Sequence, residues 1–275
     1  MHAFLWTDSG GVRDLGALAG SFGHTTAEAI NDREQVVGVS GGRAFLWTHG
    51  QGMRDLGLLP GGTGAGALDI SDNGTVVGYW LTAAGEARPF VWTESGGMRD
   101  LAPPADLSNT AAIGVNHRGE IAGYGCPPPC LDGAFRALHW SPGGQLQDLA
   151  TLLGLRESYA WGINNRGDVV GAARREGESL RAFVWNAAAG LRFLGTLPGM
   201  SDSWADDISD AGHVVGRSGD RAFLWTESRG MVDLGALPSP AGSGSHAQGV
   251  NRFGQAVGSS RVGPAHRPVL FPTVP

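Results

Sequence analysis

Short apolar runs return along the chain in a fixed order, separated by polar turns. One stretch reads "RAFLWTHGQGMRDLG" at 43–57, and nearly the same letters return at 88–102 and 221–235. A second phrase reads "AEAINDREQVVG" at 27–38 and "AWGINNRGDVVG" at 160–171. Each run holds about five residues rich in Val, Ile, Phe and Trp between Gly, Asn, Asp or Ser, which is typical of β-strands. No stretch of about ten residues has helical periodicity, so we expect an all-β protein.

The period of these runs predicts the architecture. Every repeat carries an anchor tryptophan or its counterpart, at Trp6, Trp47, Trp92, Trp140, Trp185, Trp225 and Phe271. One repeat holds four runs, which we name A ("AEAIN"), B ("VVG"), C ("RAFLW") and D ("MRDLG"). Four short strands in each repeat of about 40–50 residues are typical of a propeller blade. We therefore predict one domain over 1–275, a six-bladed β-propeller with four-stranded antiparallel blades.

The order of runs at the two ends predicts how the ring closes. The chain opens on runs C and D ("HAFLWT", "VRDLG") and ends on runs A, B and a further C-like run ("HRPVLF"). The last blade is then closed by both termini, and which of the two C-like runs completes it stays open. A solenoid is the main rival, but it needs atypical capping repeats at its ends, whereas these terminal repeats resemble the inner ones.

Composition narrows the function classes. All 20 basic Lys and Arg residues are arginines, which excludes a Schiff-base lysine and a Walker-type phosphate loop. The net charge of −6 comes without a basic run, so we expect no nucleic-acid partner. No apolar stretch approaches the roughly 18 residues of a membrane span, and no secretory signal precedes the first strand. We expect a monomer, cytoplasmic as the sequence is written, and secreted if a signal was removed.

Repeated charges and the two cysteines have structural explanations. Arg43, Arg88, Arg136 and Arg221 stand four residues before an anchor, and an Asp stands eight residues after it, so a hairpin of runs C and D predicts ion pairs. Arg181 also stands four residues before an anchor, but Phe193 takes the Asp position in that repeat, so Arg181 is predicted to lack this partner. Cys126 and Cys130 in "GCPPPC" are predicted to form a disulfide under oxidation, contributing at most about 2 kcal/mol because the loop is short.

The chain resembles the HAF-repeat family, the probable extracellular repeats. The resemblance is carried by "HAFLWT" at His2, "AINDREQVVGVS" at Ala29 and the "GMRDLG" phrases, and it covers essentially the whole chain. It implies a repetitive β protein that is often exported, and it implies no reaction. The expectation about function must therefore come from positions that differ between repeats.

Run A offers that comparison, because an alanine recurs in all six repeats: Ala27, Ala67, Ala112, Ala160, Ala205 and Ala247. A strand beside a crowded axis needs a small residue, so run A is predicted to be innermost, with its start at the mouth of the central channel. The residues on either side of the alanine share a face by alternation. In repeats two and three they are apolar or small, with Leu68 and Ile113 among them. In the other repeats they form a polar and aromatic wall: Tyr159, Trp161, Trp204, Asp206, His246, Gln248 and Glu28.

The wall predicts a small-molecule site. Asp206, His246 and Glu28 are the candidate catalytic residues, because carboxylates beside an imidazole can move protons. Tyr159, Trp161, Trp204, Gln248, Leu68 and Ile113 are candidate binding residues, with Trp80 placed in a connection between runs B and C at the same end. Spacing does not support a metal site, and no cofactor is predicted. The function classes left open are an acid–base enzyme (cyclase, isomerase, lyase or hydrolase), a non-catalytic binder of a carbohydrate or small ligand, and a protein-interaction scaffold.

Overall fold

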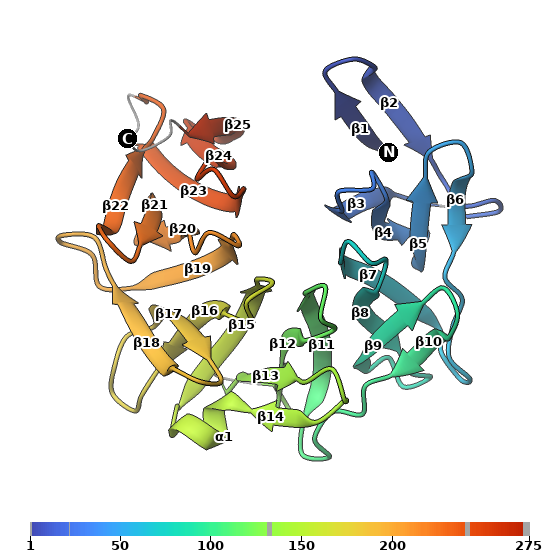
Figure 1. Ribbon diagram of the computed structural model, residues 1–275, viewed down its shortest axis with the longest axis horizontal. Helices are drawn as coiled ribbons and strands as arrows, with labels where there is room; N and C mark the ends of the chain where they lie inside the picture. The colour runs from blue at the N-terminus through green and yellow to red at the C-terminus, as the bar shows by residue number, and fades with distance from the viewer. Residues whose placement is uncertain (1, 22, 131–133, 240–242, 272–275) are drawn as a thin grey trace. The chain divides into compact units, whose positions relative to one another are not determined.

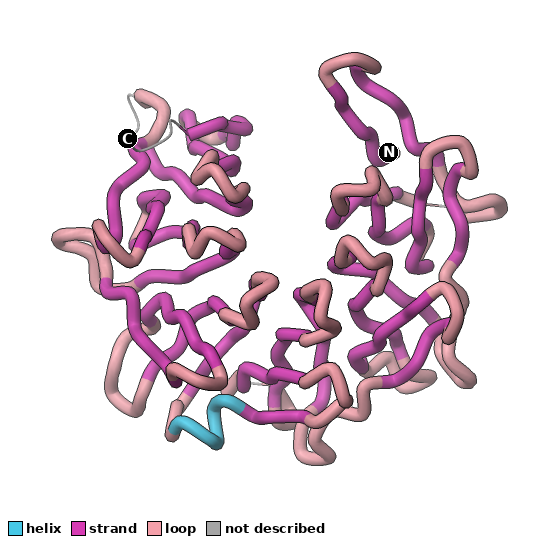
Figure 2. Tube along the Cα trace, viewed as in Figure 1, coloured by secondary structure: helices cyan, strands magenta, loops and turns pink. Residues whose placement is uncertain are grey.

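The protein is an all-β chain whose sheets are blades in a six-bladed propeller arrangement (Figure 1). The computed structural model describes residues 2–21, 23–130, 134–239 and 243–271. Almost all regular structure in this part of the chain is strand, as Figure 2 shows. The described chain divides into two compact units, residues 1–132 with 140–146 and residues 133–139 with 147–275. Each unit is described by itself, and the single domain expected from the repeat stays a prediction.

The strands follow the predicted order of runs A to D. A two-stranded N-terminal hairpin comes first, and the first three four-stranded sheets follow it: β1 (Ala3–Thr7) and β2 (Gly11–Gly16); β3 (Thr25–Ile30), β4 (Val36–Ser40), β5 (Arg43–Thr48) and β6 (Gly52–Asp55); β7 (Gly64–Ile70), β8 (Val76–Leu81), β9 (Ala87–Thr93) and β10 (Gly97–Asp100); β11 (Ser108–Val115), β12 (Ile121–Cys126), β13 (Arg136–Trp140) and β14 (Leu146–Asp148).

The later repeats give two more four-stranded sheets and, within the described residues, a three-stranded C-terminal sheet: β15 (Glu157–Ile163), β16 (Val169–Arg174), β17 (Arg181–Asn186) and β18 (Gly190–Gly195); β19 (Ser203–Ile208), β20 (Val214–Ser218), β21 (Arg221–Thr226) and β22 (Gly230–Gly235); β23 (Ser243–Val250), β24 (Ala256–Val262) and β25 (Ala265–Phe271). The hairpin and the C-terminal sheet belong to different units, so closure of the last blade by both termini stays a prediction.

One short helix interrupts the pattern. The sequence predicts no helix, yet α1 (Leu149–Leu153) follows β14. Asp148 caps it by accepting a hydrogen bond from the Thr151 amide at 3.0 Å, and Gly154 ends it in the left-handed region. Five residues give too little periodicity for a sequence-based prediction of a helix.

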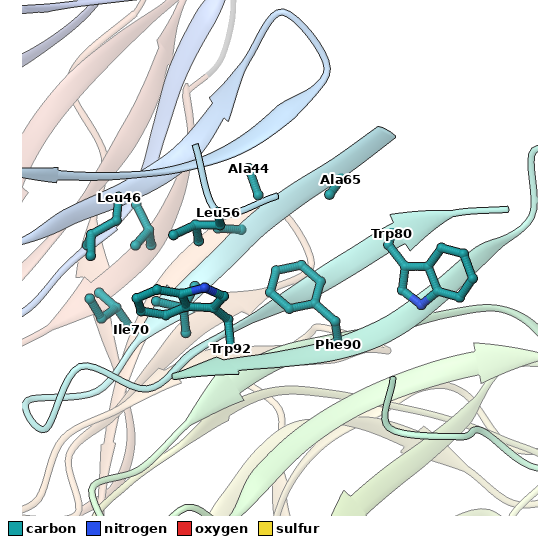
Figure 3. Packing of buried hydrophobic residues seen from close by; sticks show 11 residues of the cluster. Ala44, Leu46, Leu56, Ala65, Ile70, Trp80, Phe90 and Trp92 are labelled. Carbon is teal, nitrogen blue, oxygen red and sulfur yellow. The ribbon is translucent and has the colours of Figure 1, made fainter. Parts of the chain in front are cut away.

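The anchor tryptophans fill the core between neighbouring sheets. Figure 3 shows one such cluster in the first unit, where Trp92 lies with Ile70, Leu46 and Leu56 from two successive sheets. Trp92 is 3 % exposed, and the later anchors and Phe271 are buried as well. Trp6 differs, with 60 % of its surface exposed, because its hairpin pairs with no third strand among the described residues.

The predicted ion pairs all form within the C–D hairpins. The Arg-to-Asp distances are 2.9 Å for Arg43–Asp55, 2.6 Å for Arg88–Asp100, 2.8 Å for Arg136–Asp148 and 3.1 Å for Arg221–Asp233. In the repeat that lacks the Asp, Phe193 pairs across the hairpin with Phe183, and the Arg175 guanidinium lies 5.4 Å from the Phe193 ring centre. These pairs are part of the scaffold.

A bulge occurs in every innermost strand. The register between runs A and B shifts just after the scaffold alanine in all six repeats, for example between Ala160 and Gly162. A bulge leaves one residue unpaired and re-aims its side chain. The unpaired residue is the one directly after the alanine: Glu28, Leu68, Ile113, Trp161, Asp206 and Gln248. All six are candidate site residues, and simple alternation did not predict the bulge.

The bulge explains the glycine of "VVG". A Cβ atom on Gly171 would lie 1.8 Å from the Tyr159 carbonyl oxygen, and one on Gly78 would lie 2.0 Å from that of Gly66. The same close approach occurs at the equivalent glycine of every repeat. Only glycine therefore fits opposite the scaffold alanine.

Polar side chains tie each blade to the next. In the first unit, Asn31 Nδ2 donates to the Ser71 carbonyl oxygen at 3.1 Å, and in the second Asn164 Nδ2 donates to that of Ser209 at 3.2 Å. Buried serines make a second set: the Ser203 hydroxyl accepts from the Ala182 amide at 2.9 Å. These bonds satisfy buried backbone groups that a blade cannot satisfy alone.

Truncation of an anchor should destabilise the protein far more than truncation of a tryptophan in the predicted wall. Trp47→Ala or Trp92→Ala should lower the free energy of unfolding by roughly 3–5 kcal/mol, because each leaves a cavity in a closed core. Trp161→Ala is the matched control, since Trp161 is half-buried and should cost clearly less. Denaturant melts measure all three, and a Trp161→Ala loss equal to the anchors would make the wall a structural plug.

The scaffold glycine gives a sharper test of the bulge. Gly171→Ala should destabilise the protein by about 1–3 kcal/mol or more, because the new methyl group overlaps a backbone oxygen that cannot move alone. Gly143→Ala is the control, because its Cβ would meet only Ser141 Oγ, at 3.9 Å. Equal melting temperatures for the two variants would contradict this account of the glycine.

Candidate functional site

The centre of the candidate site is a hydrogen-bonded pair in the second unit. Asp206 lies on β19 and His246 on β23, and Asp206 Oδ2 is 2.9 Å from His246 Nε2. Their side chains are 27 % and 31 % exposed, so both are partly screened yet open to a ligand. Sequence reasoning placed the two residues together, and the structure brings them into direct contact.

The bulge in β19 sets this contact. Asp206 is the unpaired residue of the bulge, and Asp207 pairs with Val215 across to β20. The Asp207 carboxylate accepts hydrogen bonds from the backbone amides of Val250, at 2.8 Å, and of Ile208. The bond to Val250 ties β19 to β23, which is the strand that carries His246. Two adjacent aspartates thus have different tasks, one in the site and one in the scaffold.

Burial raises the pKa of the Asp207 carboxyl, and the neighbouring charge of Asp206 raises it further. The two backbone amides that donate to it act in the opposite direction and lower the pKa, but burial is the largest effect. A scaffold carboxyl that resists ionisation, Asp207, therefore lies next in the chain to the half-buried Asp206 carboxylate that bonds an imidazole.

An aromatic stack lies on the neighbouring inner strand, β15. The rings of Tyr159 and Trp161 are stacked 5.1 Å apart with an angle of 6° between their planes, and Phe135 lies 4.9 Å from Tyr159. The stack confirms that the residues on either side of the scaffold alanine share a face. At Gly162 the strand comes so close to β19 that a Cβ would lie 3.2 Å from the Asp206 carbonyl oxygen.

A buried ion pair supports this stack and was missed from the sequence. Glu157 is 5 % exposed at its side chain, accepts from Arg174 Nε at 2.6 Å and accepts from the Tyr159 hydroxyl at 2.8 Å. Glu157 and Arg174 face each other across β15 and β16. A Glu at the start of one strand opposite an Arg at the end of the next strand is the signal that could have found them.

Trp204 carries a cation on its face. The Arg217 guanidinium carbon lies 3.8 Å from the ring centre, and the two residues are direct cross-strand partners on β19 and β20. The contact fixes the ring beside the Asp206 bulge. Sequence reasoning named Trp204 but not Arg217.

The other predicted residues are more dispersed. Glu28, on β3 of the first unit, is exposed, and its place beside the Asp206–His246 pair stays a prediction. Gln248 is exposed on β23, and Leu68 and Ile113 are half-buried at the bulges of β7 and β11.

The placement of Trp80 in a connection was wrong. Trp80 lies within β8 and is buried in the core cluster of Figure 3, because this strand runs further than the "VVG" phrase suggested.

In repeats two and three the run A residues beside the alanine are apolar or small as expected, but run B adds two tyrosines that the sequence analysis did not consider. Tyr79 pairs with Gly66, and Tyr124 pairs with Ala111, so each tyrosine stands on run B opposite a small residue on run A. The chain has three tyrosines, and all of them lie at this layer of the inner strands. In four successive blades the layer thus presents one aromatic residue from one strand or the other, as Tyr79, Tyr124, Tyr159 or Trp204.

The remaining expectations concern cysteines, metal and membrane. Cys126 and Cys130 form a disulfide in the structure. Among the described residues, no group of three or more His, Cys, Asp or Glu side chains could hold a metal ion. A helix long and apolar enough to cross a membrane is likewise absent from the described part of the chain.

Comparison with known proteins shows the fold. No protein-family model matches the chain, so the HAF-repeat resemblance stays a resemblance, and no curated protein matches it either. Solved structures do match. Virginiamycin B lyase from Staphylococcus aureus is 11 % identical with a TM-score of 0.53, over 88 % of this chain and 83 % of the lyase. A puromycin hydrolase variant in complex with PGG is 15 % identical with a TM-score of 0.61, over 97 % of this chain and 47 % of the hydrolase. The chain thus spans about half of that hydrolase.

The raised pKa of Asp207 gives a pH-dependent prediction. A carboxyl whose folded pKa lies above its unfolded value favours the folded state fully at low pH, and this contribution is lost as pH rises through the folded pKa. Asp207→Asn keeps an oxygen that accepts from the Val250 amide and cannot ionise. The melting temperature of the variant relative to wild type should therefore increase between pH 4 and pH 7.

Asp8→Asn removes one exposed carboxylate from a turn and controls for net charge. Thermal melts at the two pH values measure both variants. An Asp207→Asn difference that is the same at pH 4 and pH 7, or that decreases, would contradict the raised pKa.

Proposed function

We propose that the inner-strand layer binds a small molecule and that Asp206 and His246 transfer protons to and from it. The observation that carries the proposal is the 2.9 Å contact between Asp206 Oδ2 and His246 Nε2. An ionised carboxylate accepts from Nε2–H, which leaves the lone pair on Nδ1. His246 Nδ1 is then the base, and the carboxylate stabilises the imidazolium that forms when it takes a proton.

The aromatic residues supply binding. The stacked rings of Tyr159 and Trp161 offer a flat apolar face, and Trp204 with Arg217 offers a second face beside the pair. Flat faces of this kind suit the C–H face of a sugar ring or a planar ligand. Glu28 completes the proposed catalytic set as a second carboxylate, and Gln248, Leu68 and Ile113 complete the proposed binding set. The reaction class is a cyclisation, isomerisation, elimination or hydrolysis, because each needs proton transfer and no cofactor.

Solved propellers provide precedents at the level of fold only. A virginiamycin B lyase of this fold, 12 % identical with a TM-score of 0.50, is catalytically inactive after replacement of one histidine by alanine. Such a low identity does not carry a residue role to this chain, so the proposal rests on the pair and its surroundings. The second candidate is a non-catalytic binder of a carbohydrate or small ligand, favoured by the flat Tyr159–Trp161 stack.

Conservative replacements test the proton transfer. A panel of p-nitrophenyl esters, p-nitrophenyl glycosides and aliphatic lactones would first identify a compound that the wild type converts. Asp206→Asn and His246→Gln should then each lower kcat/KM by about 10²–10⁴-fold, as expected for loss of a general base. Glu28→Gln should lower it too. Melting temperatures should stay near that of the wild type, because all three side chains are at least partly exposed.

The chain supplies its own matched control. His2 Nδ1 lies 3.0 Å from Asp14 in the N-terminal hairpin, where His2 occupies the scaffold arginine position. His2→Gln removes a histidine–aspartate contact outside the site and should leave conversion unchanged. Binding that quenches tryptophan fluorescence without any conversion would favour the binder. Full binding and conversion in all three site variants, or early melting in them, would refute the proposal.

A further inference from the structure

A cavity of about 750 Å³ lies in the second unit at the opposite end of the inner strands from the Asp206–His246 pair. It is formed by the turns that follow β15, β19 and β23 and by the C–D hairpins of the blades β15–β18 and β19–β22. None of the proposed catalytic or binding residues lines it. Its volume lies within the roughly 300–1,000 Å³ of small-molecule sites.

The cavity forms beside a turn that lacks a long side chain. The turn between runs A and B has five residues, and its third residue is Arg33, Arg118 or Arg166 in three repeats, Asn73 in the second and Phe253 in the last. In β19–β22 the third residue is Ala211, which lines the cavity. A long side chain at this position lies over the next turn, since Arg166 reaches within 2.7 Å of where a Cβ on Gly212 would be. Ala211 is too short to do so.

The same turn leaves a histidine without its usual partner. In four repeats the first turn residue is an asparagine whose Nδ2 donates to the side chain of the fifth, as from Asn164 to Asp168 at 2.9 Å. Here the first residue is Ser209 and the fifth is His213, and Ser209 Oγ accepts from the His213 backbone amide rather than pairing with the His213 side chain. His213 lines the cavity, and its Nδ1 is buried with no hydrogen-bond partner among the described residues. A buried unpaired nitrogen indicates an unfilled hydrogen-bonding position.

The charges of the lining favour an anion. Arg166 pairs with Asp168, and Arg192 pairs with Glu227 while lying 5.2 Å from the Trp225 ring centre. Arg229 also lines the cavity, and its guanidinium makes no ion pair within the described chain. One positive charge is therefore left over in the lining of the cavity that also contains His213. The larger apolar residues of the lining are Val184, Ile208, Leu224, Trp225, Val232 and Phe253.

We propose that this cavity is a second ligand site, for a small organic anion that carries an apolar ring, such as an aromatic carboxylate. The ring packs on the apolar lining. The carboxylate binds Arg229, and His213 donates to it from Nδ1. This site does not depend on the function proposed for Asp206 and His246.

Two probes with the same ring test the ligand class. Calorimetry should show 1:1 binding of 2-naphthoate to the full chain, and 2-naphthalenemethanol should bind at least about tenfold more weakly, because it lacks the charge that Arg229 and His213 recognise. Arg229→Gln should weaken naphthoate binding by about tenfold, as for loss of one charged hydrogen bond. Arg99→Gln removes an exposed arginine on β10, outside the cavity, and should have no effect.

A filling variant tests the location. Ala211→Phe introduces the residue that the last repeat carries at this turn position, adds no charge, and should abolish naphthoate binding while the melting temperature is kept. His246→Gln should leave naphthoate binding unchanged, which separates this site from the proposed active site. The inference is overturned if naphthoate does not bind at millimolar concentration, if the neutral analogue binds equally well, or if folded Ala211→Phe binds as the wild type does.

Discussion

The close approach of the two innermost strands at each scaffold alanine is the constraint on which the rest of this structure depends. There the backbone oxygen before the alanine fills the space that a side chain on the opposite glycine would need, since a Cβ on Gly171 would lie 1.8 Å from that oxygen. The strand relieves this crowding by a bulge, which frees the next residue from pairing. Every blade repeats the same geometry, so every blade presents one unpaired side chain directly after its scaffold alanine.

That geometry separates the scaffold from the residues available for chemistry. Residues before and after the bulge hold the blades together, as Asp207 does with the Val250 amide and Ser203 with that of Ala182. The unpaired residue makes no structural contact that is common to the six repeats. Its residue type therefore varies, as Leu68, Trp161 and Asp206 show. A single aspartate at one bulge and a single histidine on the adjacent strand are enough to make a site without disturbing the fold.

Departures from the repeat mark functional candidates at both ends of the inner strands. At one end, His246 replaces residues that are aromatic or small in the other blades. At the other end, Ala211 and His213 replace a long side chain and a hydrogen-bonded partner. In both places the scaffold around the substituted residue is unchanged, since the neighbouring backbone bonds of the turn, such as that from Ser209 N to His213 O at 2.9 Å, are kept. A repeat protein can thus acquire sites by local substitution because each blade contributes its own share of stability.

The sequence by itself determined the strands, their order, the position of run A at one edge of each sheet, the anchor tryptophans and the Arg–Asp pairs, because each depends on local pattern and a fixed period. It also placed Asp206 and His246 on neighbouring inner strands, at positions that the period makes equivalent. Tertiary structure decided the rest. The bulge arises from the backbone contact between runs A and B, Tyr79 and Tyr124 join the aromatic layer through cross-strand pairing, and Trp80 is buried by the adjoining blade. The Glu157–Arg174 pair and the cavity lined by His213 are likewise built from residues on different strands. The spacing of these residues along the chain does not show how close they lie in space.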